Sequence, residues 1–131
     1  KHSQFPDTDY FLMRAAEAWL TFAEATARMN GGTATGAAAD AINDIRERAN
    51  TTTKDSYTMN EILDEWAREF YYEGRRRIDL IRHGKFSGNS YVWQWKGGAY
   101  NGTTFSSNLN IFAIPDTDLN ANPNLVQNPG Y

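Results

Sequence analysis

Three aromatic residues, Tyr91, Trp93 and Trp95, alternate within a stretch rich in glycine and asparagine. In an extended strand, alternate side chains project from the same face, so the three rings would form one row. Flat aromatic faces suit the apolar C–H faces of sugar rings, and nearby amide and hydroxyl groups can bond to sugar hydroxyls. With Tyr100 a few residues further on, this row is a candidate glycan-binding platform. In the alternative interpretation, the same rings cover a layer of helices as part of the core.

Three glutamates stand four residues apart, which places them on one face of a helix: Glu65, Glu69 and Glu73. Carboxylates at this spacing can act as acid and base on a sugar or bind a metal ion. The surrounding arginines favour an ion-pair network instead, because Glu73 and Arg77 form an i,i+4 pair. Arg75 and Asp79 form another such pair. We therefore predict a structural network that consists of Glu69, Glu73, Arg75, Arg76, Arg77 and Asp79.

The other reactive residue types give little support to an enzyme. His2 lies near the start of the chain, and His83 lies where a cation favourably meets the C-terminal end of a helix. The sequence has no cysteine and no Gly-x-Ser-x-Gly motif. Residues 116–120 begin like a calcium loop, but Ala121 and Gln127 stand where that loop needs Gly and Glu, so helix capping by the aspartates is favoured. We expect no catalytic residue, no metal site and no cofactor.

Two helices with alanine-rich faces are expected to begin the scaffold that positions these residues. Apolar residues recur every three or four positions over residues 10–28, and Asp7 or Asp9 can cap the start of this helix. Asn and Gly at residues 30–32 end it. A second helix over residues 37–49 follows after a short link and is therefore antiparallel to the first.

The packing of these two helices is expected to combine small and large side chains. Their alanines allow the two backbones to approach closely, and Trp19 and Phe22 are expected to supply the bulk of the core between them.

A capping box, Thr58 with Glu61, predicts the start of a third helix. Its apolar stripe contains Ile62, Leu63, Trp66 and Phe70. Glycine at position 74 interrupts this helix, and the apolar pattern resumes afterwards, so either a continuation or a kinked second segment should end at residues 83–84.

Beyond residue 84 the sequence changes in character. Residues 85–110 are rich in Gly, Asn, Ser and Thr, so we expect an irregular aromatic loop in which residues 91–95 form a short strand. The Asn101-Gly102 pair indicates a turn. The tail, residues 111–131, contains an Ile-Pro pair, one expected helical turn after Pro115 and two Asn-Pro pairs.

Composition restricts the classes of function. The chain has 131 residues, of which 40% are hydrophobic and 14% aromatic, which is sufficient for a globular core. Its formal net charge of −3 gives no general attraction to nucleic acid, so we expect no nucleic-acid partner. No stretch approaches the roughly 20 apolar residues that span a bilayer.

Several blocks, in this order, resemble the C-terminal region of SusD-like (SusD/RagB family) outer-membrane nutrient-binding lipoproteins. They are YFLMRAAEAWL at 10–20, AEA at 23–25, AINDIRERA at 41–49, ILDE at 62–65, EF at 69–70, EGRR at 73–76, DLIRHG at 79–84, IP at 114–115 and NPNLVQNPGY at 122–131. The match extends over nearly the whole chain, and the ordered set is far more specific than any single block.

The resemblance implies an all-α fold of tetratricopeptide-like helix hairpins that binds oligosaccharide or polysaccharide without cleaving it. It also implies attachment to the outer membrane through a lipidated N-terminal cysteine, and delivery of the glycan to a SusC-like TonB-dependent transporter. The expected organisation is one C-terminal region with a helical scaffold over 7–84, the aromatic loop over 85–110 and the tail over 111–131, without the larger N-terminal part. Two alternatives remain: a tetratricopeptide-type protein-interaction scaffold without a sugar site, and a glycoside hydrolase fragment that uses two of the three spaced glutamates.

Overall fold

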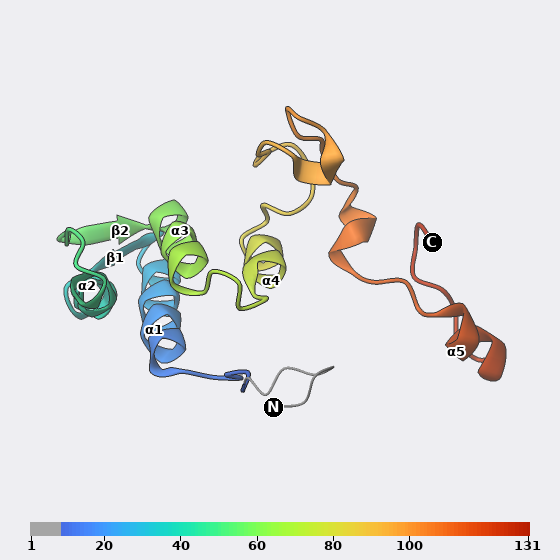
Figure 1. Ribbon diagram of the computed structural model, residues 1–131, viewed down its shortest axis with the longest axis horizontal. Helices are drawn as coiled ribbons and strands as arrows, with labels where there is room; N and C mark the ends of the chain where they lie inside the picture. The colour runs from blue at the N-terminus through green and yellow to red at the C-terminus, as the bar shows by residue number, and fades with distance from the viewer. Residues whose placement is uncertain (1–8) are drawn as a thin grey trace, which may run out of the picture. The chain divides into compact units, whose positions relative to one another are not determined.

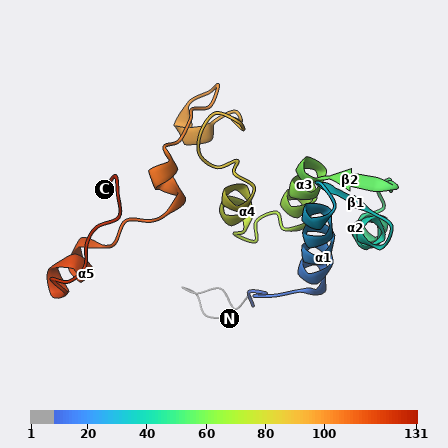
Figure 2. The same cartoon turned by 180° about the vertical axis from the view of Figure 1, so that it is seen from behind.

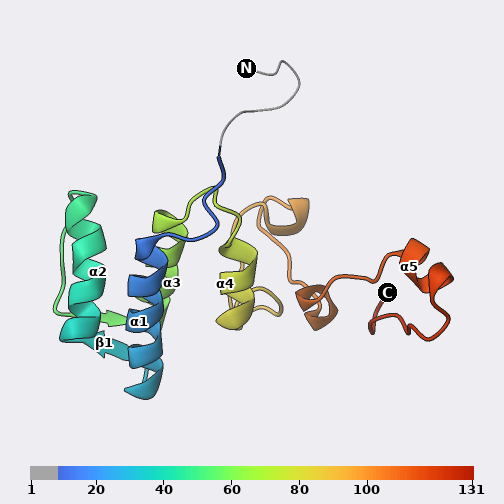
Figure 3. The ribbon, with the colours of Figure 1, turned by 90° about the horizontal axis from the view of Figure 1, so that it is seen from below.

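Three helices and a two-stranded ribbon form the first of two units in the computed structural model, which describes residues 9–131 (Figure 1). Within the described residues, this unit ends at residue 73, and residues 74–131 form the second. In chain order, the elements of the first unit are α1 (Ala15–Met29), β1 (Thr33–Thr35), α2 (Ala37–Arg48), β2 (Ser56–Thr58) and α3 (Met59–Glu69). Figure 3 shows α1 and α2 side by side, which confirms the expected hairpin.

Helix α1 begins five residues later than its apolar pattern suggested. Residues 10–13 are exposed and lie outside the helix, and Arg14, in an extended conformation, is the residue before its first turn. Capping by Asp9 is therefore wrong, and Asp7 lies outside the described residues. The reason is tertiary: the Arg14 side chain bonds to α3 and to the residues after it, which fixes the chain direction before the helix starts.

The end of α1 follows the sequence prediction. Asn30 donates its backbone N–H to the carbonyls of Thr26 and Ala27, and Gly31 and Gly32 follow with φ of 72° and 95°. A positive φ favours glycine, because a Cβ would clash with the backbone there. Helix α2 ends at Arg48, within one residue of the prediction.

The ribbon between β1 and β2 was not predicted. The strands pair antiparallel, with Thr33 opposite Thr58 and Ala34 opposite Tyr57, and the ribbon lies beside α2 in Figures 1 and 2. Each strand has three residues, which is too short for alternation to show in the sequence.

The capping box at the start of α3 is confirmed. The Glu61 backbone N–H donates to Thr58 Oγ1 at 3.4 Å, and the Thr58 N–H donates to Glu61 Oε2 at 2.8 Å. Lys54 Nζ also donates to Glu61 Oε1 at 2.7 Å. These hydrogen bonds, first that from Lys54, lower the pKa of Glu61 to about 2.

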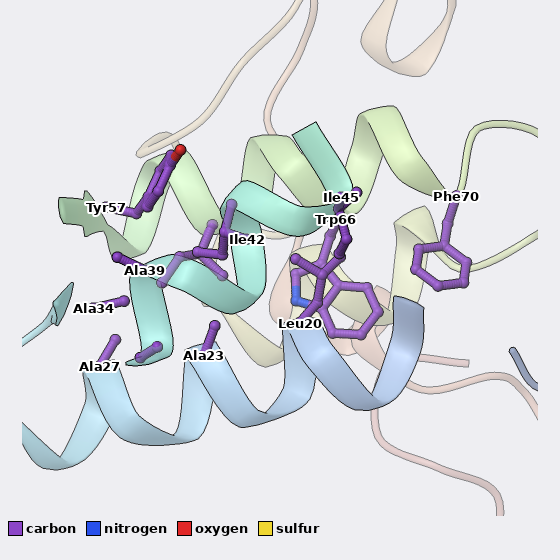
Figure 4. Close-up of a cluster of buried hydrophobic side chains, with 12 residues drawn as sticks. Leu20, Ala23, Ala27, Ala34, Ala39, Ile42, Ile45, Tyr57, Trp66 and Phe70 are labelled. Carbon is purple, nitrogen blue, oxygen red and sulfur yellow. The ribbon is translucent and has the colours of Figure 1, made fainter. Parts of the chain in front are cut away.

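The core of the first unit centres on Trp66, not on the two aromatics of α1. Figure 4 shows Trp66 with Leu20 and Ile45 where the three helices meet. The Trp66 indole N–H donates to a carboxylate oxygen of the buried Glu24 at 2.9 Å. Trp19 and Phe22 are 42% and 50% exposed, so the expectation that they fill the core is wrong. Both side chains point away from the side of α1 that carries Leu20 and that α2 and α3 cover.

The second unit contains α4 (Arg76–Arg82), two short 3-10 turns η1 (Lys96–Gly98) and η2 (Ser107–Asn110), and α5 (Asp116–Ala121). The interruption at Gly74 is a full break, since α3 ends at Glu69 and both Tyr72 and Gly74 have positive φ. The predicted end of the following segment is confirmed, with His83 as the residue after the last turn of α4.

The tail is arranged around α5, the helical turn predicted after Pro115. The residue before its first turn is Pro115, so the aspartates at positions 116 and 118 lie inside the helix and do not cap it. The Gln127 side chain accepts from Ile114 N and donates to Ile114 O, both at 2.9 Å, which ties the last residues back to the start of the tail.

Helices dominate the described residues, and the all-α prediction is confirmed. Within residues 9–131, none of the helices combines the length and the apolar character needed to cross a membrane.

Candidate functional site

The four aromatic candidates form two separate ring pairs. Tyr91 and Trp93 lie 5.5 Å apart with a tilt of 47°, and Trp95 and Tyr100 lie 5.6 Å apart with their planes at 89°. The expected strand over residues 91–95 is absent from this described part of the chain. A single row of three rings is therefore wrong, although all four residues lie in one loop.

The reason for this rearrangement is the backbone of Trp95. Its φ of 66° and ψ of 6° place it in the left-handed region, where an L-residue costs about 1–2 kcal/mol. Its N–H donates to Tyr100 O at 3.3 Å, and Gly98 N donates back to Trp95 O at 3.0 Å. The chain therefore turns at Trp95 and does not extend, and the predicted turn at Asn101-Gly102 is confirmed by the bond from Gly102 N to Ala99 O at 2.8 Å.

A buried lysine holds the turn in place. Lys96 is 1% exposed, and its Nζ donates to Tyr91 O at 2.9 Å. The ammonium group lies 4.6 Å from the ring centre of Trp93 and 5.0 Å from that of Phe105. A desolvated cation is attracted to aromatic faces, so Lys96 gathers these groups around itself. Sequence reasoning missed this residue, because nothing in its type or spacing distinguishes it from a surface lysine.

Exposure separates the two pairs. Trp95 and Tyr100 are 64% and 62% exposed, whereas Trp93 is 36% exposed and packs against the Lys96 ammonium. The Tyr91 hydroxyl accepts from Arg76 Nη2 at 3.0 Å, so Tyr91 is tied to α4. Trp95 and Tyr100 are therefore the more exposed pair, whereas Tyr91 and Trp93 contact the charged side chains of Arg76 and Lys96.

The exposed pair has the chemistry of a sugar-stacking corner. Two perpendicular rings offer one flat face and one edge, and the same loop carries four exposed polar side chains: Gln94, Asn101, Thr103 and Thr104. A pyranose ring could stack on one indole or phenol face while its hydroxyls bond to these polar groups. We refer to Trp95 and Tyr100 as the aromatic corner.

Arginines from the first unit bind each of the three spaced glutamates. Glu65 accepts from Arg46 and Arg68, in each case at 2.7 Å. Glu69 pairs with Arg14 and Arg48, both at 2.5 Å. These three carboxylates are neutralised by fixed cations, which does not favour an acid and base pair among them.

Arg14 is the centre of this arginine–glutamate network. Its guanidinium donates to Glu73 Oε2 at 2.9 Å and Oε1 at 2.7 Å, and it lies 4.0 Å from the ring centre of Phe70. The hydrogen bond to Glu73, more than that to Glu69, raises the pKa of Arg14. No helical spacing in the sequence connects Arg14 with residues 55 and 59 positions away, so the pair was not predicted.

The remaining members of the predicted network lie in the second unit. Asp79 is 1% exposed and accepts from Arg82 at 3.0 Å, with Arg75 at 3.8 Å. Arg77 donates to Leu109 O at 2.7 Å and lies over the rings of Phe86 and Phe112. Arg77 therefore fixes the end of the aromatic loop to α4. Within the described residues, no cluster of three His, Asp or Glu side chains is arranged to hold a metal ion.

Two known proteins are similar to this chain in sequence. The chain is 55% identical over 131 residues to the starch-binding protein SusD of Bacteroides thetaiotaomicron, covering 99% of this chain and 23% of that protein. It is 26% identical over 132 residues to a SusD-like protein of Bacteroides ovatus, covering 84% of this chain and 24% of that protein. The chain thus spans about a quarter of the length of these relatives.

Solved structures show the same fold. The surface glycan-binding protein A from Bacteroides uniformis superposes with a TM-score of 0.75 at 32% identity, covering 91% of this chain and 27% of that one. A SusD superfamily protein from Parabacteroides distasonis has a TM-score of 0.73 at 26% identity, covering 93% and 27%. The SusD family matches residues 1–131, and the protein therefore belongs to the SusD family.

Proposed function

We propose that the full-length protein binds a glycan at the bacterial cell surface and passes it on without cleaving it. The observation that carries this proposal is the 55% identity, over 99% of the chain, to a protein named for starch binding. The similarity in fold to a surface glycan-binding protein supports it. An α-glucan is the first ligand to test, because starch is the glycan that this relative's name specifies.

Within this chain, the aromatic corner is the proposed contact with the glycan. Trp95 and Tyr100 are the exposed members of the candidate set, and Trp95 is held in a strained conformation by the turn that follows it. Strain at an exposed aromatic residue is consistent with a binding role, since the surrounding loop must maintain it. A rigid indole also loses little conformational entropy on binding.

The experiment measures binding of the full-length protein to starch and to a panel of other polysaccharides by native affinity electrophoresis and calorimetry. Trp95→Ala and Tyr100→Ala are compared with Tyr71→Ala, a control that removes a 73% exposed ring from outside the aromatic loop. Removal of one stacking ring should cost about 1–2 kcal/mol of binding free energy, which corresponds to roughly 5- to 30-fold weaker binding. Equal affinities for all three variants would place the glycan contacts outside the aromatic corner, and no binding to any polysaccharide would contradict the function.

Two further parts of the proposal concern location and partner. We propose that a lipid anchor on the full-length polypeptide holds it at the outer membrane, where it delivers glycan to a SusC-like TonB-dependent transporter. Surface proteolysis of intact cells tests the location, and copurification with the transporter tests the partner. Release of reducing sugar during incubation with the bound polysaccharide would instead favour the hydrolase alternative.

A further inference from the structure

A left-handed turn lies at the centre of the aromatic loop. Trp95, Gly97 and Gly98 all have positive φ, at 66°, 66° and 80°. Glycine adopts such angles without steric cost, whereas the Cβ of any other L-residue crowds the backbone there. Within the turn over residues 95–98, Trp95 is therefore the residue whose conformation needs support from contacts elsewhere in the loop.

Lys96 follows directly after this strained residue, and its backbone is fixed on both sides. The Lys96 N–H donates to Trp93 O at 3.1 Å, and Lys96 O accepts from the Thr103 N–H at 3.0 Å. A Cβ on Gly97 would lie 2.4 Å from Thr103 Cγ2, so the loop is closely packed at this point. The peptide units next to Lys96 therefore have little freedom to rotate.

The side chain of Lys96 is fixed in the interior of the loop. It is 1% exposed, and its Nζ donates to Tyr91 O at 2.9 Å. The Tyr91 hydroxyl accepts from Arg76 Nη2 at 3.0 Å, so Tyr91 connects the lysine to α4. Lys96 points inward, and the preceding side chain of Trp95 lies outside, where it is 64% exposed. The exposed indole is therefore held relative to a helix, not by the loop alone.

The charge of Lys96 is unfavourable at this position. Among the described residues, its ammonium group contacts the Tyr91 carbonyl and two aromatic faces, and no carboxylate. The ring centres of Trp93 and Phe105 lie 4.6 Å and 5.0 Å from it. Burial of a cation without a counter-ion costs free energy, and a methionine side chain could fill the same space without this cost. The charge therefore points to a role beyond filling space.

We infer that Lys96 is the positioning residue of the aromatic corner. Its fixed backbone and side chain hold Trp95 in the left-handed conformation, and this conformation presents the indole face beside Tyr100 to a sugar ring. The structural part of the inference concerns the loop alone, and the effect on affinity rests on the proposed binding of glycan at the aromatic corner.

Hydrogen exchange of the full-length protein without glycan tests the structural part. Lys96→Met keeps the length of the side chain but removes its charge, and Lys85→Met is a matched control that makes the same change at a partly buried lysine of the same unit. The reporters are the amides of Trp95 and Gly98, which donate to Tyr100 O and Trp95 O. We expect Lys96→Met to lower their protection about tenfold or more relative to the control, while the amides of α4 keep theirs. Equal protection in the two variants would overturn the inference.

Calorimetry separates positioning from folding. The titrations use soluble starch, or the polysaccharide of the panel that the wild-type protein binds. Loss of folded protein lowers the stoichiometry at an unchanged dissociation constant, whereas a misplaced indole raises the dissociation constant at full stoichiometry. We expect Lys96→Met to raise the dissociation constant at full stoichiometry by roughly 5- to 30-fold, the range expected for Trp95→Ala. Lys96→Arg keeps a cation and a donor and should recover part of the affinity.

The double variant shows whether Lys96 acts through Trp95. If it does, Lys96→Met should weaken binding little or not at all in a protein that already carries Trp95→Ala. Full additivity of the two changes would overturn the inference, as would a wild-type dissociation constant for Lys96→Met where Trp95→Ala weakens binding, and both results leave the proposed function intact. Absence of wild-type binding to every polysaccharide would overturn the proposed function and the effect on affinity together, and hydrogen exchange then decides whether Lys96 holds Trp95.

Discussion

Replacing Arg14 by alanine should loosen the contact between the start of α1 and the end of α3. Arg14 provides charge-assisted hydrogen bonds to Glu69 and Glu73 and covers the ring of Phe70. A bond of this type contributes about 1.5–3 kcal/mol when buried, and the cation–π contact about 1 kcal/mol. The Arg14 side chain is 27% exposed and Glu73 31%, so solvent recovers part of this loss, whereas Glu69 keeps Arg48. We expect a net loss of about 2–3 kcal/mol.

Hydrogen exchange of the full-length protein measures this loss locally. A cost of about 2–3 kcal/mol corresponds to roughly 30- to 150-fold less protection of the hydrogen-bonded amides in the last turn of α3 and the second turn of α1. Arg14→Lys keeps the charge but not the planar fork, and should recover less than half of the protection. Arg68→Ala is the control, because Arg68 is 56% exposed and Glu65 retains Arg46. Similar protection in the Arg14 and Arg68 variants would refute the central role of Arg14.

Three further outcomes follow from the same structure. The pKa of Glu61 is lowered to about 2, so the contribution of this carboxylate to stability is complete above its ordinary pKa near 4.5 and is lost as the pH falls toward 2. In urea unfolding, Glu61→Gln should therefore cost about 1 kcal/mol at neutral pH after allowance for exposure, and nothing near pH 2. Trp93→Ala should lower the melting temperature, because Trp93 packs on Lys96, whereas Trp95→Ala should lower glycan affinity at an unchanged melting temperature; the reverse pattern would exchange the two roles. Asp79→Ala should lower the free energy of unfolding by about 2–3 kcal/mol, because it removes the buried carboxylate that faces Arg75 and Arg82. The glycan affinity of the folded variant should be unchanged. A stable variant without affinity would make Asp79 a binding residue.

Local patterns predicted the elements whose determinants lie close together in sequence. The capping box of Thr58 and Glu61, the Gly31-Gly32 termination and the helical turn after Pro115 each depend on neighbours within a few residues. The start of α1 could not be predicted in the same way, because it depends on the pairing of Arg14 with a glutamate 55 residues later.

The candidate site was predictable in its residue types but not in its geometry. Alternation of Tyr91, Trp93 and Trp95 favoured a strand, yet Trp95 turns left-handed where its backbone bonds to Tyr100. The burial of Lys96 depends on a pocket that the folded loop itself creates, and sequence patterns treat lysine as a surface residue. The exposure of Trp19 and Phe22 could likewise not be predicted, because apolar residues occur at helical spacing on the exposed side of α1 as well as on its buried side.

The connections between the short strands and the helices that follow them are at most one residue long. Thr58 is the last residue of β2 and also caps α3, and a single residue, Gly36, separates β1 from α2. An insertion at either junction would rotate the following helix by about 100° and move its apolar stripe out of the core, while a shift by one residue within β2 would turn Tyr57 to the opposite face. Natural insertions and deletions among relatives should therefore avoid residues 33–37 and 56–59 and accumulate in the aromatic loop and the tail.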